Sequence, residues 1–258
     1  MSEAAREWGE LWGKSGSDWA DLQEGVVRPP IERVLDRLHV ASGDRLLDVG
    51  CGAGGGTQLA AERGANVTGI DAAEPLIAIA RQRLPHADLR VGDMNSLPWP
   101  DGSFDVVTGF NAYQYADDPV AALRESLRVL KRGGRLGVVV WGPADECEAV
   151  AHFLALRALL PPNPNAPGPL AGEEAVADWI TEAGFELLTD ELVDTPWEYP
   201  DVATAVRALM SAGPIARVVA KAGGTAVEGA LTACANAYRT PAGRVLFRNK
   251  FRALTAVA

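Results

Sequence analysis

The sequence predicts a doubly wound α/β domain built on a mostly parallel sheet. Three observations favour this fold class. Short apolar runs bounded by turn residues alternate with helical segments, a glycine-rich turn follows the first run, and acidic residues stand at or just after the ends of several runs. Right-handed crossovers bring the carboxyl ends of parallel strands to one edge of a sheet, where ligands bind. The acids and the glycine-rich turn are therefore expected to lie together.

Five strands and three helices are predicted up to Trp141. The strands extend over 45–49, 66–70, 88–91, 104–110 and 135–141, and the helices over 57–63, 74–83 and 118–131. The last helix begins at Asp118-Pro119, which are typical helix-start residues, and Gly133-Gly134 ends it.

The second half of the chain adds helices and two strands. Helical patterns cover 146–160, 172–183 and most of 200–239, with breaks at Gly213-Pro214 and Gly223-Gly224, and strand patterns cover 185–193 and 244–257. The proline-rich stretch 161–169 is predicted to be a loop, either a lid over a substrate pocket or a plain connector.

The turn Gly50-Cys51-Gly52-Ala53-Gly54 is the strongest local signal. Glycine has no Cβ and adopts positive φ without strain, so the backbone can pass close to a ligand. The amide N–H groups of such a turn can meet a carboxylate. Asp48, two residues before the first glycine, has the opposite preference and would attract a cation such as a ligand ammonium.

A dinucleotide-dependent oxidoreductase is the first alternative. Gly50, Gly52 and Gly55 satisfy the spacing G-x-G-x-x-G, and Asp71 stands where an acid that binds a ribose is expected. Asp48 would repel a pyrophosphate, however. A dinucleotide needs neither this acid nor Asp93, which follows the third strand.

The segment 47–54, Leu-Asp-Val-Gly-Cys-Gly-Ala-Gly, resembles the first motif of class I S-adenosylmethionine-dependent methyltransferases. The resemblance continues through 67–71 and 91–94, the second strand with its acid and the acid after the third strand. The segment 97–107, LPWPDGSFDVV, resembles the LPFPDGSFDVV of the small-molecule branch that includes ubiquinone and menaquinone biosynthesis enzymes, and 127–136 resembles the family's RVLKPGG segment.

This resemblance implies a cofactor, S-adenosylmethionine, with S-adenosylhomocysteine as product, and methyl transfer to a small metabolite or quinone-like acceptor. It implies that Asp48 binds the methionine ammonium, that Asp71 accepts from the ribose hydroxyls, and that Asp93 accepts from the adenine amino group. The full set of cofactor residues that it implies is Asp48, Gly50, Cys51, Gly52, Gly54, Asp71, Ala72, Asp93, Met94 and Asn111. Methyl transfer is an in-line displacement that needs alignment of the methyl donor with the acceptor and exclusion of water, and it requires no metal.

Four residues are candidates for the acceptor site. Tyr113 and Gln114 follow the fourth strand, where the family binds the incoming nucleophile. Trp12 and Trp19 are either packing residues of an N-terminal helix or an aromatic wall for an apolar acceptor. No catalytic base is assigned. A protein that binds the cofactor without catalysis is a third alternative.

The resemblance also implies the domain organisation. The family's sheet has seven strands, and the last strand enters antiparallel between its neighbours beneath a helical cap. A single domain over 1–258 is expected, with an N-terminal helical lid (1–40), a cofactor-binding core (41–142), a helical cap with the sixth strand (143–243) and the last strand (244–258).

Composition excludes several other classes. The net charge of −10 and the lack of a basic cluster disfavour nucleic acid as a partner. The three cysteines lie far apart, which indicates neither a disulfide framework nor a zinc site. No apolar run approaches the ~20 residues of a membrane span. A cytoplasmic enzyme is expected, and a homodimer is compatible with the sequence.

Overall fold

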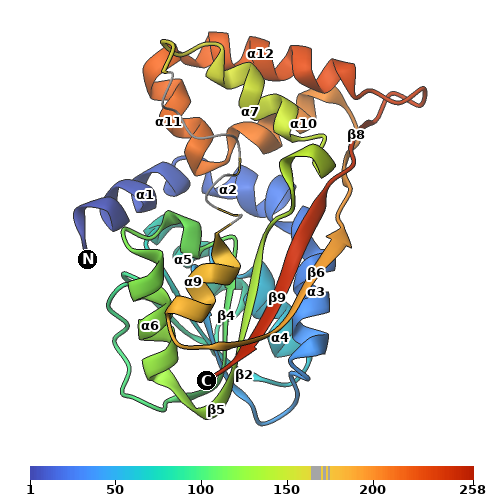
Figure 1. Cartoon of the computed structure of the whole chain (residues 1–258). Helices are drawn as coiled ribbons and strands as arrows, with labels where there is room; N and C mark the ends of the chain where they lie inside the picture. The colour runs from blue at the N-terminus through green and yellow to red at the C-terminus, as the bar shows by residue number, and fades with distance from the viewer. Residues whose placement is uncertain (164–169, 171–172, 174) are drawn as a thin grey trace.

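The computed structural model describes residues 1–163, 170, 173 and 175–258 and has the predicted doubly wound α/β fold (Figure 1). Among these residues, the main sheet has seven strands in the order β3-β2-β1-β4-β5-β9-β6. Their bounds are β1 Arg45–Val49, β2 Asn66–Asp71, β3 Asp88–Val91, β4 Phe104–Phe110, β5 Leu130–Trp141, β6 Glu186–Asp194 and β9 Lys250–Val257.

Strand β1 lies at the point where the chain changes direction across the sheet. It pairs in parallel with β2 on one side and with β4 on the other. In doubly wound sheets, the crevice outside the carboxyl ends of the strands at this switch point is where ligands bind. The fold therefore brings the ends of β1, β2 and β4 together at one edge.

Helices cover both faces of the sheet, because alternate residues of each strand point to opposite sides. Leu46 belongs to the buried cluster that includes residues of α3 and α4, whereas Leu47 belongs to the one that includes residues of α6 and α9. The helices next to the sheet are α3 Arg28–Arg37, α4 Gly55–Glu62, α5 Glu74–Arg83, α6 Pro119–Val129 and α9 Val176–Glu182. Helix α6 ends earlier than predicted, since Leu130 already pairs with Phe104 of β4.

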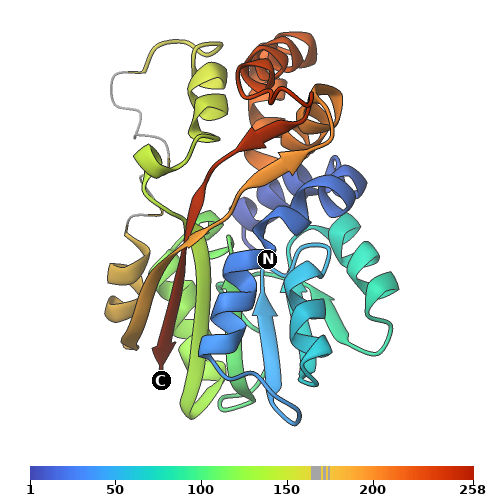
Figure 2. The ribbon, with the colours of Figure 1, turned by 90° about the vertical axis from the view of Figure 1, so that its right-hand side faces the viewer.

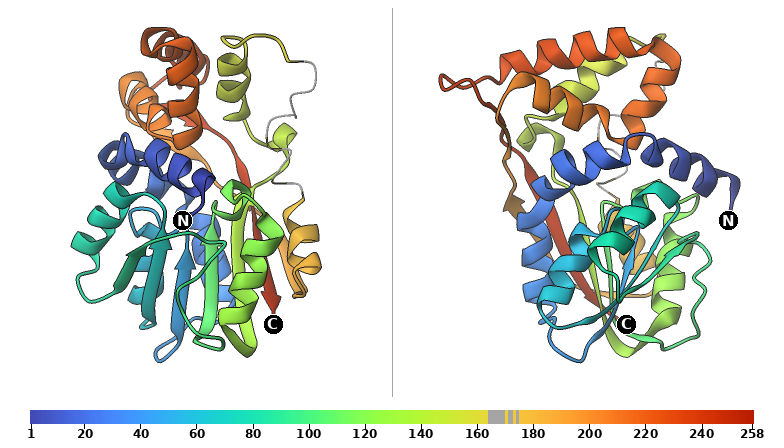
Figure 3. Two further views of the ribbon diagram at one scale, coloured as in Figure 1. Left: turned by 90° about the vertical axis from the view of Figure 1, so that its left-hand side faces the viewer. Right: turned by 180° about the vertical axis from the view of Figure 1, so that it is seen from behind.

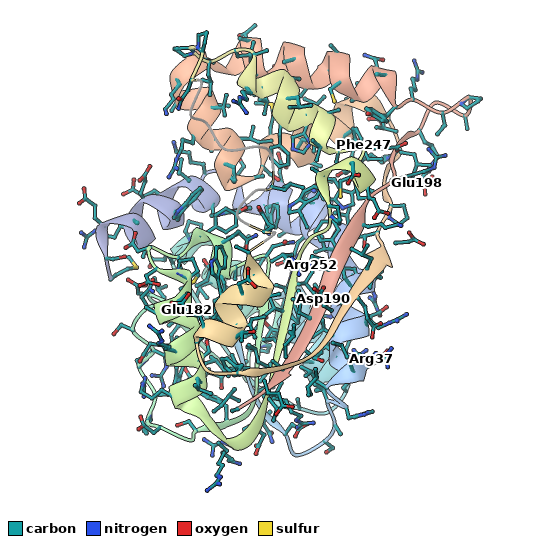
Figure 4. The ribbon with its side chains drawn as sticks, viewed as in Figure 1. Arg37, Glu182, Asp190, Glu198, Phe247 and Arg252 are labelled. Carbon is teal, nitrogen blue, oxygen red and sulfur yellow. The ribbon has the colours of Figure 1, made fainter. Side chains whose placement is uncertain are left out.

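The predicted antiparallel last strand is confirmed, but its bounds differ. Strand β9 pairs antiparallel with β5 and β6 (Figure 2), while β8 (Val245–Phe247) pairs with β7 (Trp197–Tyr199) in a separate ribbon. Between β8 and β9, the Oδ1 of the buried Asn249 accepts a hydrogen bond from the Ala149 amide at 3.0 Å. At the edge of the main sheet, Arg252 of β9 pairs with Asp190 of β6 at 2.5 Å (Figure 4).

Helical segments lie above the carboxyl edge of the sheet (Figures 1 and 3). The N-terminal segment contains α1 Glu3–Gly13, α2 Gly16–Asp18, the π-helical turn η1 Trp19–Gln23 and the 3₁₀ turn η2 Glu24–Val27. Helix α1 contacts α5 of the core and α11 of the cap, so it lies between them. The helices of the cap are α7 Val150–Arg157, α10 Val202–Met210, α11 Gly213–Ala222 and α12 Gly224–Ala237.

Part of the predicted proline-rich loop lies outside the described residues, namely 164–169, as do 171, 172 and 174 near the start of the helix predicted over 172–183. Within the described part of the chain, no single helix is long and apolar enough to cross a membrane. Helices α10 and α11 reach that length and composition only together, and they meet at an angle of 91°.

Candidate functional site

A cavity opens at the carboxyl ends of β1, β2 and β4, beneath α1. It contains about 1040 Å³ of empty space, part of it open to solvent. All the predicted cofactor residues except Gly54 line it: Asp48, Gly50, Cys51, Gly52, Asp71, Ala72, Asp93, Met94 and Asn111.

The glycine turn has the backbone conformation that glycine permits. Gly50, Gly52 and Gly54 have φ of 73°, 55° and 88°, a region that other residues rarely adopt. A Cβ on Gly50 would lie 2.5 Å from the Ala112 side chain. Gly54 faces Ala80 of α5 rather than the cavity. It lies just before α4 and turns the chain into that helix, so the structure does not place it against a ligand in this cavity.

Asp48 lies beneath the turn, because alternation along β1 directs its side chain toward α4. Its Oδ2 accepts from Thr57 Oγ1 at 2.7 Å, and its Oδ1 accepts from Thr108 Oγ1 at 2.9 Å. Burial and, to a smaller extent, the negative charges of Glu24 and Asp71 raise the pKa of Asp48 to about 7, against the effect of the two hydroxyl groups.

Asp71 ends β2 and holds the turn in place. Its Oδ2 accepts from the Gly52 amide at 2.9 Å, and its Oδ1 accepts from the Ala73 amide at 2.7 Å. Burial raises its pKa, an effect that the amides oppose. Each carboxylate oxygen has a further lone pair, so Asp71 can accept two more hydrogen bonds from a ligand.

Asp93 lies under the start of the chain. Its Oδ2 accepts from the Ser2 amide at 2.7 Å, and its Oδ1 accepts from the Asn95 amide at 3.0 Å. Burial alone would raise the pKa of Asp93, but the amides of Ser2 and Asn95 outweigh it and lower that pKa. The start of the chain therefore covers the end of the cavity at which the sequence places the adenine.

Glu24 is a residue of this site that sequence reasoning missed. Its Oε1 accepts from the Ala53 amide at 2.9 Å, and its Oε2 lies 2.5 Å from Arg83 Nη1. The sequence predicts that the N–H groups of the turn bind a carboxylate. In the structure, the Ala53 N–H donates to the carboxylate of Glu24, and the Gly52 N–H donates to that of Asp71. Glu24 comes from a helical turn with no local motif, so the sequence contains no signal for it.

The charges that line the cavity favour a cation. Among the described residues, its walls contain the acids Glu24, Asp48, Asp71, Asp93 and Asp117 but no lysine, arginine or histidine. S-adenosylmethionine, with a sulfonium and an ammonium, fits such a lining, whereas the pyrophosphate of a dinucleotide would be repelled. The raised pKa of Asp48 agrees with this, because a bound cation would offset its burial and, to a smaller extent, its repulsion by Glu24 and Asp71.

The four acceptor-site candidates have different positions. Trp12 and Trp19 line the cavity, with ring centroids 4.6 Å apart. Tyr113 does not: it is fully buried beneath the sheet edge, and its hydroxyl group lies 2.8 Å from Ser126 Oγ. Gln114 is not a lining residue either, while Tyr115 is. Residues 113–115 form a 3₁₀ turn, in which successive side chains point about 120° apart, and this turn aims Tyr115 rather than Tyr113 at the cavity.

A second cavity adjoins the first beneath the cap. The two share Trp12, Trp19, Val27, Asn111 and Tyr115 as lining residues. Of the three histidines, His39 and His86 are exposed, and His152 lines this second cavity.

Comparisons with known proteins agree with this geometry. Residues 47–138 match the family model described as a methyltransferase domain. The chain is 33% identical to a demethylmenaquinone methyltransferase of Beutenbergia cavernae over 66% of this chain and 76% of that protein. It is 30% identical to a malonyl-[acyl-carrier protein] O-methyltransferase of Serratia marcescens over 84% and 82%.

A solved structure is similar as well. The structure of the [4+2]-cyclase SpnF matches with a TM-score of 0.56 and 28% identity over 88% of this chain and 79% of that one. The similarity to the two methyltransferases extends well beyond the glycine turn, and the acid-lined cavity suits a sulfonium cofactor rather than a dinucleotide. The chain belongs to the S-adenosylmethionine-dependent methyltransferases, and it is an enzyme that uses S-adenosylmethionine for methyl transfer.

Proposed function

We propose that the chain methylates a small-molecule acceptor, held in the second cavity, with S-adenosylmethionine bound in the first. The observation that carries this proposal is the joined pair of cavities, of which the first is lined by acids around a glycine turn. The cofactor supplies a methyl group on a positively charged sulfur, ready for in-line displacement. The chain has to align the two partners and exclude water.

The positions of the acids suggest their roles. Asp71, with free lone pairs at the end of β2, would accept from the two ribose hydroxyls. Asp93 and the Met94 amide would bind the adenine, and Asp48 with the glycine turn would bind the methionine end. Asn111 lines both cavities, so it would lie beside the path of the methyl group.

We also propose that the segment 1–40 acts as a lid. Five residues before Gly13 line the first cavity: Ser2, Ala5, Trp8, Gly9 and Trp12. The Ser2 amide is bonded to Asp93, so a ligand cannot enter along this side unless the segment moves. A lid of this kind would keep water from the sulfonium during transfer.

Calorimetric titration with S-adenosylhomocysteine, and with NADH as the rival ligand, tests the cofactor assignment. We expect micromolar binding of S-adenosylhomocysteine, about −8 kcal/mol, and no binding of NADH. Asp71→Asn keeps the shape of the side chain but loses one acceptor oxygen and the charge, and should weaken binding by a factor of roughly 10 to 100.

Asp88→Asn is the matched control, because Asp88 is exposed at the start of β3 and pairs with Arg90. It should bind S-adenosylhomocysteine as the wild type does. Binding of NADH alone, or equal losses in the two variants, would contradict the proposed site.

A further inference from the structure

The second cavity has aromatic walls. It encloses about 530 Å³ of empty space, part of it open to solvent. Besides His152, six of its lining residues carry aromatic rings, and each comes from a different helix, turn or strand: Trp12, Trp19, Tyr115, Trp141, Phe153 and Trp197. Several of these rings touch one another, with centroids 4.8 Å apart for Trp141 and Trp197 and 5.7 Å apart for Trp141 and Phe153. Flat faces around a narrow space favour a flat, apolar occupant.

No charged side chain is among the described residues that line this cavity. The first cavity, in contrast, is lined by acids. A carboxylate or ammonium group in the second cavity would lose its hydration without gaining an ionic partner, which costs several kcal/mol. The lining therefore selects against charged occupants.

Three buried polar atoms in these walls have no hydrogen-bond partner within the described part of the chain: Asn111 Oδ1, His152 Nδ1 and Trp197 Nε1. Burial lowers the pKa of His152 to about 3, so its ring is neutral at physiological pH. Buried polar atoms without partners are uncommon in folded proteins. Three of them in one cavity indicate that a ligand supplies the missing bonds.

One of the three atoms belongs to a residue that lines both cavities, whereas the other two belong to residues that line the second cavity alone. Asn111 follows β4, has a positive φ of 53° and also lines the cofactor cavity. His152 on α7 and Trp197 on β7 belong to the side of the cap. A row of ring contacts links His152 to Trp197. The centroids of the His152 and Phe153 rings lie 4.0 Å apart, and the ring of Trp141 contacts the rings of both Phe153 and Trp197.

We propose that the second cavity binds an uncharged, flat aromatic acceptor with two oxygen atoms, of which the one nearer the cofactor cavity belongs to a hydroxyl group that donates to Asn111 Oδ1. The distal oxygen accepts from Trp197 Nε1–H and hydrogen bonds with the neutral ring of His152. This inference rests on the proposed function, and it narrows the acceptor to one chemical class. A hydroxyl group both donates and accepts without carrying a charge, so it satisfies the unpartnered atoms at the least desolvation cost.

Calorimetry on the complex with S-adenosylhomocysteine tests the proposal with two probes that share one naphthalene ring system. We expect 2,6-dihydroxynaphthalene to bind, and 6-hydroxy-2-naphthoate, which places a carboxylate at the distal end, to bind at least about tenfold more weakly. Trp197→Phe keeps an aromatic ring but removes the N–H donor, and His152→Phe removes both ring nitrogens. Each should weaken binding of the diol about tenfold.

Trp179→Phe is the matched control, since Trp179 lies on α9 against the opposite face of the sheet. It should bind the diol as the wild type does, and all three variants should keep their affinity for S-adenosylhomocysteine. Any one of three results would overturn the proposal: no binding of the diol to the cofactor-loaded protein, equal binding of the naphthoate, or unchanged binding of the diol in both cavity variants. Failure of S-adenosylhomocysteine to bind the wild type would instead contradict the proposed function. In that case the two probes would be titrated into the free protein, and the same three results would overturn the proposal about the second cavity.

Discussion

The carboxylate of Glu24 accepts a hydrogen bond from the backbone amide of Ala53 at 2.9 Å, although the two residues lie 29 positions apart. Its second oxygen pairs with Arg83, which also donates to the carbonyl groups of Ala53 and Ala20. The N-terminal segment is thereby tied to both the glycine turn and α5. The N-terminal segment and the cofactor loop are therefore joined through the Glu24–Arg83 ion pair.

Glu24→Gln should loosen this coupling. The amide side chain can still accept from Ala53, but the charge of Arg83 loses its partner, and we expect the free energy of unfolding to fall by about 1–3 kcal/mol. Limited proteolysis should cut the segment before Val27 faster than in the wild type. Glu32→Gln breaks the exposed pair with Arg28 and serves as the control, with a change below about 1 kcal/mol. If the two variants resist protease equally well, Glu24 does not hold the lid.

Gly9→Ala should separate α1 from the core. A Cβ at Gly9 would lie 2.3 Å from the carbonyl oxygen of Ala72, and no side chain can yield to relieve that contact. We expect hydrogen exchange in α1 to become faster and the affinity for S-adenosylhomocysteine to fall severalfold, while the rest of the domain stays folded. Gly25→Ala is the control, because a Cβ there meets nothing within 4 Å. Equal exchange in α1 of both variants would refute the close packing of the lid.

Asp48 makes cofactor binding pH-dependent. Its pKa is raised to about 7, so this carboxyl group is mostly protonated below pH 7 in the folded protein without ligand. The stability that this group contributes is present at low pH and is lost as the pH rises through about 7. A ligand ammonium favours the ionised form instead. The affinity for S-adenosylhomocysteine should therefore increase about tenfold from pH 6 to pH 8, as the ionised share of Asp48 rises from about a tenth to about nine tenths.

Titration of the wild type and of Asp48→Asn at pH 6, 7 and 8 measures this effect. Burial also raises the pKa of Glu24 and Asp71, so the difference between the two proteins, rather than either profile alone, isolates Asp48. The variant should lose most of the increase. The same slope in both proteins would show that Asp48 does not ionise on binding.

Tyr113→Phe and Tyr115→Phe should affect different properties. Tyr113 is buried, and its hydroxyl group bonds with Ser126, so its loss should lower the free energy of unfolding by about 0.5–1.5 kcal/mol and leave turnover unchanged. Tyr115 lines both cavities, so Tyr115→Phe should alter KM for the acceptor with less effect on stability. Chemical denaturation and steady-state kinetics on both variants separate the two. A large fall in kcat in Tyr113→Phe would show that Tyr113 takes part in the acceptor site after all.

The cofactor core could be predicted because its signals are local. Asp48, the glycine turn, Asp71 and Asp93 each end a strand or follow one directly, and a parallel sheet brings such positions to one edge whatever the rest of the chain does. Tyr113 shows the limit of this reasoning. The sequence places it next to the site, but the pitch of a 3₁₀ turn decides that Tyr115 faces the cavity.

By itself, the sequence determined the alternation of strands and helices, the acids at the strand ends and the positive-φ glycines, because each depends on a few adjacent residues. Its family resemblance added the mostly parallel sheet with an antiparallel last strand. Only the tertiary structure decided that Glu24 caps the turn, that Ser2 lies on Asp93, and that His152 and Trp197 meet around one cavity. These relationships join segments tens of residues apart. The packing of the N-terminal segment and of the helices above the sheet fixes them, and no short-range pattern encodes that packing.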